Sequence, residues 1–222
     1  MELSKEQIQY IDHRLENEGV KYWDIRIEML DHVVSDVEKK LEKDEEFNKA
    51  VTNSFISLGW NGSFKDLTKS RLFGINRIVR KQYFNQIKLF FTNFRSICLI
   101  LFLISTYYFV FSTFDLKTFK IITISILFSP IIYGVFLFFS EFSRKGKSGY
   151  LTYSSFYIFF SFLMLNVVIQ FVKPNGIIPV TEETHLFVWF IITCLNSIFS
   201  MAGILVHSQT SKKIKNIELK LK

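Results

Sequence analysis

The feature that most constrains this chain is a charge-free apolar run of 19 residues, Ser96–Phe114, bounded by Arg95 and Asp115. At a rise of 1.5 Å per residue, a helix of this length just crosses a hydrocarbon core of about 30 Å. The residues before the run have the composition of a water-soluble segment, and most of the chain after it is apolar. The run therefore predicts the first span of a membrane-embedded part that follows a soluble N-terminal part.

Three more apolar segments follow, so the sequence predicts a bundle of four transmembrane helices. Their approximate limits are Ser96–Thr113, Phe119–Ser140, Leu151–Val172 and Leu186–Val206. Apart from Lys120 at the edge of the second span, none of them contains a charged residue. This composition disfavours proton-coupled transporters, pumps and intramembrane proteases, because such proteins generally need ionisable groups at depth.

The distribution of positive charge between the spans predicts their orientation. Arg144, Lys145 and Lys147 lie between the second and third spans, whereas residues 173–185 hold one Lys and two Glu. More lysines follow the fourth span, at positions 212, 213, 215, 220 and 222. The positive-inside rule then places both termini in the cytoplasm. Together with a Phe-, Ile-, Lys- and Asn-rich composition typical of a low-GC bacterium, this predicts a multi-pass protein of the bacterial inner membrane.

The soluble part divides into an acidic and a basic segment. Residues 1–62 hold 8 Lys/Arg against 14 Asp/Glu, a net of −6, and residues 63–95 hold 8 against 1, a net of +7. The basic segment lies next to the first span, where anionic lipid headgroups attract each charge by about 1 kcal/mol. Anionic lipid is therefore an expected partner. Direct nucleic-acid binding is disfavoured, because the segment that is free of the membrane is acidic.

Local signals in residues 1–70 predict a small cytoplasmic domain of short helices. Ser4 and Gln7 have the spacing of a capping box, and Gly19 and Gly59 are typical residues for ending a helix. The first helix should end at Gly19, and two more should span about Lys21–Lys43 and Glu46–Leu58. The apolar positions of the second of these three helices recur at 3-4-3-4 spacing. They are Ile27, Leu30, Val34, Val37 and Leu41.

The segment between this domain and the first span, residues 71–95, is predicted to be a basic amphipathic helix. Four basic residues gather towards one side, and apolar residues cover much of the other. The basic residues are Arg77, Arg80, Lys81 and Lys88. Such a helix can lie in the headgroup layer or run straight into the membrane helix, and we expect the first. Residues 96–206 then hold the four spans, and residues 207–222 form a basic cytoplasmic tail.

Polar residues within the third and fourth spans are candidates for intramembrane packing. In the fourth span they follow 3-4-3-4 spacing on one side of the helix, and in the third two amides are i, i+4 neighbours. These residues are Thr193, Asn196, Ser200, Gly203 and His207, with Asn166 and Gln170. Small residues let helices approach closely, and buried amides seek partners in lipid. We expect packing within the bundle or in a homo-oligomer, with a polar substrate path as the alternative.

One acidic stripe in the soluble part is a weak candidate for a metal site. Asp24, Glu28, His32 and Asp36 are each four residues apart, and carboxylates flanking a histidine can ligate a divalent ion. A real site needs more ligands, and Asp12-His13 is the only obvious source. We expect a solvated helix face instead, with no metal and no cofactor. The chain contains no recognisable catalytic motif.

Several short motifs in residues 1–70 are similar to those of the bacterial HAAS signalling domain. They are Arg26-x-Glu28-x-Leu30-Asp31-His32, Asp36-x-Glu38, Phe47-Asn48-Lys49-Ala50 and Leu58-Gly59. The resemblance implies an interaction module on a membrane anchor, associated with a PadR-like transcriptional regulator. The chain departs from the family in its long linker helix and in a Trp60-Asn61-Gly62 turn, where the family usually has a proline-containing stretch.

These observations leave three functions open. The first is a non-enzymatic membrane protein whose cytoplasmic domain binds a protein partner in signalling or regulation, and this is the function we expect. The second is an accessory membrane subunit of a transporter or export complex. The third is a membrane-surface enzyme acting on lipid, in which Glu28, Asp31 and His32 lie near the headgroups.

Overall fold

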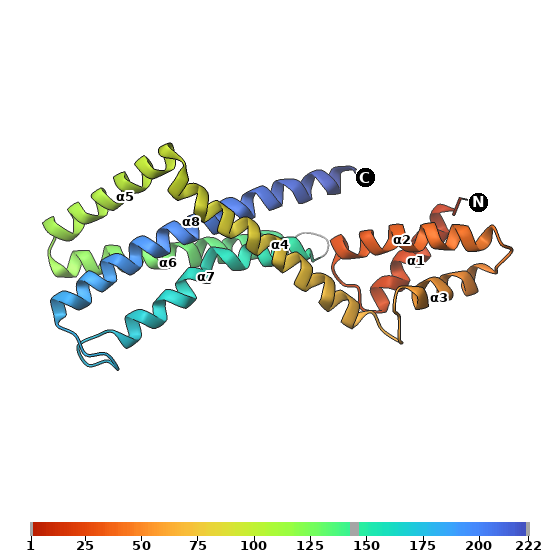
Figure 1. The fold of residues 1–222 in the computed structure, drawn as a ribbon, viewed down its shortest axis with the longest axis horizontal. Coiled ribbons are helices and arrows are strands. Elements are labelled where there is room, and N and C mark those ends of the chain that lie inside the picture. The colour runs from red at the N-terminus through yellow and green to blue at the C-terminus, as the bar shows by residue number, and fades with distance from the viewer. Residues whose placement is uncertain (1, 143–146, 221–222) are drawn as a thin grey trace. The chain divides into compact units, whose positions relative to one another are not determined.

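The computed structural model describes residues 2–142 and 147–220. Within these residues the chain forms eight helices and no strand (Figure 1), which confirms the predicted all-α fold. The helices are α1 Lys5–Asn17, α2 Trp23–Leu41, α3 Phe47–Ser57, α4 Lys65–Thr92, α5 Phe94–Thr113, α6 Leu116–Phe142, α7 Gly149–Phe171 and α8 Glu182–Lys220. Four of them, α5 to α8, are long and apolar enough to cross a membrane, which is consistent with the predicted multi-pass protein.

The chain divides into two compact units. The N-terminal unit comprises Met1–Arg77 and Arg144–Thr152, and the bundle unit comprises Ile78–Ser143 and Tyr153–Lys222. The predicted boundary near residue 70 lies inside α4, and a short segment before and at the start of α7 belongs to the N-terminal unit. Of the basic loop predicted between the second and third spans, Lys147 is exposed, whereas residues 144–146 lie outside the described residues, as does Lys222.

Helices α1 to α3 begin and end where the local signals predict. The Ser4 hydroxyl accepts a hydrogen bond from the Gln7 backbone N–H, and the Gln7 side chain accepts one from the Ser4 backbone N–H at 2.9 Å. This pair is the predicted capping box. Gly19 and Gly59 follow the ends of α1 and α3 with φ of 110° and 90°, a backbone conformation that favours glycine.

The core of the N-terminal unit is aliphatic, and it corrects the predicted inward face of α2. Of the five predicted stripe residues only Val37 is fully buried. The buried face of α2 is Ile25, Met29, Val33 and Val37, while Ile27, Leu30, Val34 and Leu41 are half-buried. Apolar residues lie on both sides of this buried face. The sequence of α2 is therefore compatible with two overlapping apolar stripes, the predicted one and the observed one. The packing of α1 and α3 selects the one with i, i+4 spacing.

Helix α4 joins two segments that the sequence analysis treats as separate. It runs unbroken from Lys65 to Thr92, because Gly74 inside it weakens a helix without ending it. Asn93 then ends it and caps α5, accepting a hydrogen bond from the Arg95 backbone N–H at 3.1 Å. Helix α4 and the first candidate span are therefore two separate helices. This excludes the alternative in which the basic segment continues straight into the first span.

Helix α8 is longer than the predicted fourth span and takes in most of the predicted tail. It has 39 residues, which corresponds to about 58 Å at 1.5 Å per residue. Since a hydrocarbon core is about 30 Å thick, a large part of α8 extends beyond a single crossing. His207, Thr210 and Ile214 in this extension are buried. Over these residues the predicted tail therefore continues helix α8 and packs against the rest of its unit.

Candidate functional site

The start of α7 is held by a side chain that lies more than 120 residues earlier in the chain. The Asp24 carboxylate, in the first turn of α2, accepts hydrogen bonds from the Gly149 and Tyr150 backbone N–H groups at 3.0 and 3.1 Å. It also accepts one from the Ser148 hydroxyl at 2.8 Å. That hydroxyl in turn accepts from the Leu151 N–H at 3.3 Å. Asp24 and Ser148 together therefore satisfy the free N–H groups of the first turn, and the negative charge suits a helix N-terminus.

The other three candidate spans take their caps from their own sequence. Asn93 caps α5, and Asp115 accepts from the Lys117 and Thr118 N–H groups at the start of α6. The Thr118 hydroxyl also donates to Asp115 at 2.7 Å, and these hydrogen bonds lower the pKa of the Asp115 carboxyl. The Thr181 hydroxyl accepts from the Thr184 N–H at the start of α8. Among the described residues, α7 is the candidate span whose cap includes a side chain from a distant helix.

Backbone contacts reinforce the contact between α2 and the start of α7. The Trp23 backbone N–H donates to the Lys147 carbonyl oxygen at 3.0 Å, one residue before Asp24. Gly149 is buried, and a Cβ atom there would lie 3.0 Å from the side chains of Leu72 and Ile75 on α4. A larger residue there would require the ends of these two side chains to shift by a few tenths of an ångström. We call Asp24 with residues 147–151 the α7 junction.

The structure distributes the acidic stripe of α2 among separate contacts. Asp24 belongs to the α7 junction, Glu28 accepts from Arg71 at 2.7 Å, and His32 is exposed. Asp36 pairs with Lys40. No three His, Cys, Asp or Glu side chains gather as metal ligands within the part of the chain that the structure describes.

The environment of Asp36 favours its charged form. Burial alone would raise the pKa of the Asp36 carboxyl. Hydrogen bonds from Lys40, Ser54 and Ser57, together with the Lys40 charge, outweigh burial and lower it. Glu28 and Asp36 thus each take part in an ion pair, with Arg71 and Lys40 respectively.

Four of the five candidate residues of α8 face α7 in a buried seam, whereas Thr193 lies on the wall of a neighbouring cavity. Thr193, Asn196, Ser200, Gly203 and His207 are all buried. On α7, the Ser161 hydroxyl donates to Asn196 Oδ1 at 2.8 Å and lies 3.1 Å from the Ser200 hydroxyl. Ser154 Oγ lies 3.0 Å from His207 Nδ1. Hydroxyls of α7 therefore supply hydrogen-bond partners to this seam, and the packing candidates Asn166 and Gln170 do not. Those two residues are half-buried and exposed, respectively, and lie outside this seam.

Gly203 allows a close approach of α7 and α8. A Cβ atom at this position would meet the Tyr157 carbonyl oxygen at less than van der Waals distance. Such an approach between backbones is what small residues permit in membrane helices. The seam therefore fixes where α7 and α8 cross.

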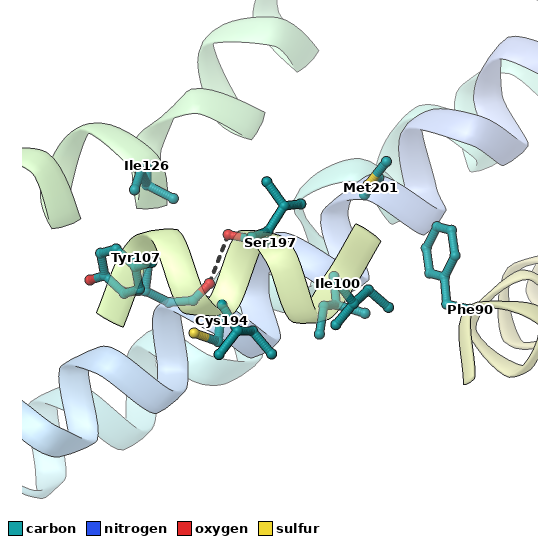
Figure 2. Close-up of a pocket in the computed structure, with 11 residues that line it drawn as sticks. Phe90, Ile100, Tyr107, Ile126, Cys194, Ser197 and Met201 are labelled. Atoms are coloured by element: carbon teal, nitrogen blue, oxygen red, sulfur yellow. Dashed lines mark hydrogen bonds between the residues drawn. The ribbon is translucent and has the colours of Figure 1, made fainter. Parts of the chain in front are cut away.

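Beside this seam lies a partly open cavity of about 280 Å³, lined by the end of α4 and by α5, α6 and α8 (Figure 2). Phe90 and Tyr107 lie at its opposite ends, and its walls are mostly apolar. The Tyr107 hydroxyl is hydrogen-bonded to Thr123 at 2.6 Å, and the Ser197 hydroxyl donates to the Thr193 carbonyl oxygen at 2.8 Å. No residue spacing in the sequence predicts this cavity, because residues from four different helices line it.

Two buried polar side-chain atoms of α8 lack hydrogen-bond partners in the described part of the bundle. They are Thr193 Oγ1, on the cavity wall, and Asn196 Nδ2. The Tyr107 hydroxyl lies near Thr193, but its hydrogen bond is to Thr123 at 2.6 Å, and Thr193 Oγ1 makes no contact that meets hydrogen-bond geometry. Leaving a buried polar group without a partner costs about 1–3 kcal/mol.

The four basic residues predicted to meet lipid headgroups are all exposed along α4. Arg77, Arg80, Lys81 and Lys88 point away from the buried side of the helix, where Val79 and Tyr83 lie. The Tyr83 ring lies 4.8 Å from that of Tyr157 on α7. Exposed aromatic residues, among them Phe84 and Phe91, alternate with the basic ones. Their contact with lipid remains a prediction.

Comparisons of the chain with protein-family models, with curated proteins and with solved structures give no match. The similarity to the HAAS domain therefore rests on the motifs in residues 1–70 and remains a prediction.

Proposed function

We propose that this chain is a non-enzymatic signalling or regulatory protein of the bacterial inner membrane. In this proposal α5 to α8 cross the membrane, both termini are cytoplasmic, and the helical N-terminal unit binds a protein partner. A conformational change in the bundle is passed through α7 to the N-terminal unit and its partner. Binding of the partner can act on the bundle by the same route. The exposed basic face of α4 contacts anionic lipid headgroups.

The α7 junction is the observation that carries this proposal. A domain that was only tethered to a membrane would need no specific contact with a distant span. Here the Asp24 carboxylate accepts three hydrogen bonds at the start of α7. Displacing α2 therefore uncaps α7, and moving α7 pulls on α2. A helix cap contributes about 1 kcal/mol, enough to shift a two-state equilibrium several-fold.

The chemistry of the N-terminal unit indicates the kind of partner. Residues 1–62 carry a net charge of −6, and many of their carboxylates are exposed, among them Asp31 and Glu42. Opposite charge speeds association and selects partners. We therefore expect a partner with a basic surface. The resemblance to HAAS domains points to a PadR-like regulator as one such partner.

Cysteine labelling tests the orientation on which the proposal depends. In a background with Cys98 and Cys194 replaced by alanine, single cysteines are placed at Asp12, Asn216 and Ile178. A membrane-impermeant maleimide added to intact cells should label only position 178, and permeabilised cells should show labelling at all three. Labelling of positions 12 and 216 in intact cells would overturn the proposal.

Site-specific photo-crosslinking separates a regulatory partner from a larger membrane complex. A photoreactive amino acid is placed at Asp31 or Glu42, and in matched variants at the exposed bundle residues Phe102 or Phe136. We expect a protein adduct from the domain positions. Adducts from the bundle positions alone would favour an accessory membrane subunit and contradict the proposal.

A further inference from the structure

The cavity of the bundle unit has the properties of a ligand site rather than of a packing defect. Its volume of about 280 Å³ is nearly twice that of a cavity of about 150 Å³ known to admit benzene. Ile100 and Tyr107 on its α5 wall are seven residues apart, which gives a length of roughly 10 Å along that helix. The space is therefore elongated and large enough for a medium-sized molecule.

The lining determines the chemistry of the occupant. None of the described residues that line the cavity is charged, so an ion would be left without a counter-charge. Two of its hydroxyls are already engaged, that of Tyr107 with Thr123 and that of Ser197 with the backbone of α8. Thr193 Oγ1 is buried at 1% exposure, lies on the cavity wall and has no hydrogen-bond partner among the described residues. It is the group left to recognise a ligand.

The surroundings of the cavity indicate how a ligand enters. Leu103 and Met201 line it and are themselves partly exposed on the outside of the bundle, at 49% and 36%. If α5 and α8 cross a membrane, that side faces lipid. A molecule dissolved in the bilayer can therefore reach the cavity without passing through water.

We propose that this cavity binds an uncharged, largely apolar molecule with one hydrogen-bonding oxygen, of the class of aliphatic alcohols. The chain of the molecule fills the space towards Phe90, and its oxygen pairs with the Thr193 hydroxyl. The inference deepens the proposed function by naming the kind of signal that the bundle receives. It depends on that function only through the membrane placement of the bundle.

Photoaffinity labelling with an octanol that carries a diazirine ring tests the site directly. The full-length protein in phosphatidylcholine nanodiscs is irradiated with the probe, and adducts are located by tandem mass spectrometry. We expect adducts on cavity-lining residues such as Leu103, Ile104 and Ile198 that saturate and that excess unlabelled 1-octanol displaces. Adducts spread over outward-facing residues such as Phe102 and Phe109, without saturation, would overturn the proposal.

Two cavity variants and a control identify the recognition group. Thr193→Val keeps the shape and removes the hydroxyl, so the apparent affinity should fall roughly three- to tenfold. Ser197→Phe fills the space and should abolish saturable labelling. Thr106→Val removes a hydroxyl that is exposed and bonded to the Phe102 carbonyl, and it should change nothing. Unchanged affinity in Thr193→Val would overturn the assignment, whether or not Ser197→Phe folds.

Comparing nanodiscs with delipidated protein in detergent distinguishes a free ligand from a lipid chain. Saturable labelling in both settings supports the proposal. Labelling in detergent alone would contradict it, because a phospholipid acyl chain, which has no polar group for Thr193, would then be the natural occupant. None of these measurements involves the N-terminal unit. A negative result would therefore contradict the ligand site without contradicting the role proposed for the α7 junction.

Discussion

The N-terminal unit and the bundle unit differ in which residues they bury. The former buries Val33, Val37 and Phe55 and exposes most of its charges, as a protein in water does. The latter buries Ser161, Asn196 and other polar side chains. It exposes a large set of apolar residues that includes Phe102, Phe109, Phe136 and Ile132.

This inversion indicates that the two units meet different solvents. In water, burial of apolar surface drives folding, whereas in lipid the surroundings are as apolar as the side chains. Helices in lipid are then held together by close approach and by hydrogen bonds, which the α7–α8 seam supplies. The four predictions that follow test this difference, from the largest expected effect to the smallest.

The largest effect should come from a charge in the core of the N-terminal unit. Val33 is fully buried, so Val33→Asp places an unpaired carboxylate there and should destabilise the unit by at least about 3 kcal/mol. Its neighbour Val34 is only half-buried, and Val34→Asp should cost much less. Hydrogen exchange of α1 to α3 in the full-length protein measures both. A greater loss of protection in Val34→Asp would contradict the register observed for α2.

The same kind of substitution on the outside of the two units should give opposite results. Phe102→Asp places a charge where the bundle unit is exposed, and in lipid this should cost about 2.5–3.5 kcal/mol of insertion free energy. Ile56→Asp, at an exposed site of the N-terminal unit, should stay within about 0.5 kcal/mol. Carbonate-resistant membrane yield reports the first and hydrogen exchange the second. Equal tolerance of both would remove the distinction between the units.

A smaller effect should come from adding a single methyl group to glycine. Gly203→Ala introduces a Cβ against the Tyr157 carbonyl and should weaken the α7–α8 crossing by about 1–3 kcal/mol. Gly74→Ala, in α4, meets nothing within 4 Å and should stabilise its helix by about 0.5–1 kcal/mol. Thermal unfolding in detergent compares the two variants. If both substitutions raised the unfolding temperature, the close approach of α7 and α8 at Gly203 would be absent.

The smallest effect concerns acid. Because the folded protein lowers the pKa of Asp36, its contribution to stability is full above the ordinary aspartate value of 3.8 and is lost as the pH falls through the lower folded value. Asp36→Asn should therefore be less stable than the wild type at pH 7, with the difference shrinking towards pH 3. Asp31→Asn, at an exposed position of the same helix, serves as the control. A difference that grows on acidification would contradict the sign of the shift.

Features with a local sequence signal could be predicted, and those formed by distant residues could not. The spans are apolar runs, and the Ser4 capping box and the glycine stops each lie within a few residues. The inward face of α2 needed the packing of α1 and α3, because apolar residues border it on both sides. Asp24 could be seen only as part of an acidic stripe, since its partners at Gly149 and Tyr150 lie 125 and 126 residues away.

The most direct test of the proposed link between α2 and α7 is amide hydrogen exchange at residues 149 and 150 of the full-length protein in nanodiscs. Asp24→Ala removes the carboxylate that accepts from both amides, and Asp31→Ala is the matched change at an exposed position of α2. Loss of a cap worth about 1 kcal/mol predicts roughly fivefold faster exchange of the two amides in Asp24→Ala. In Asp31→Ala we expect the exchange rate of the wild type. Equal exchange in both variants and the wild type would show that α7 begins without Asp24, and would contradict the proposed link.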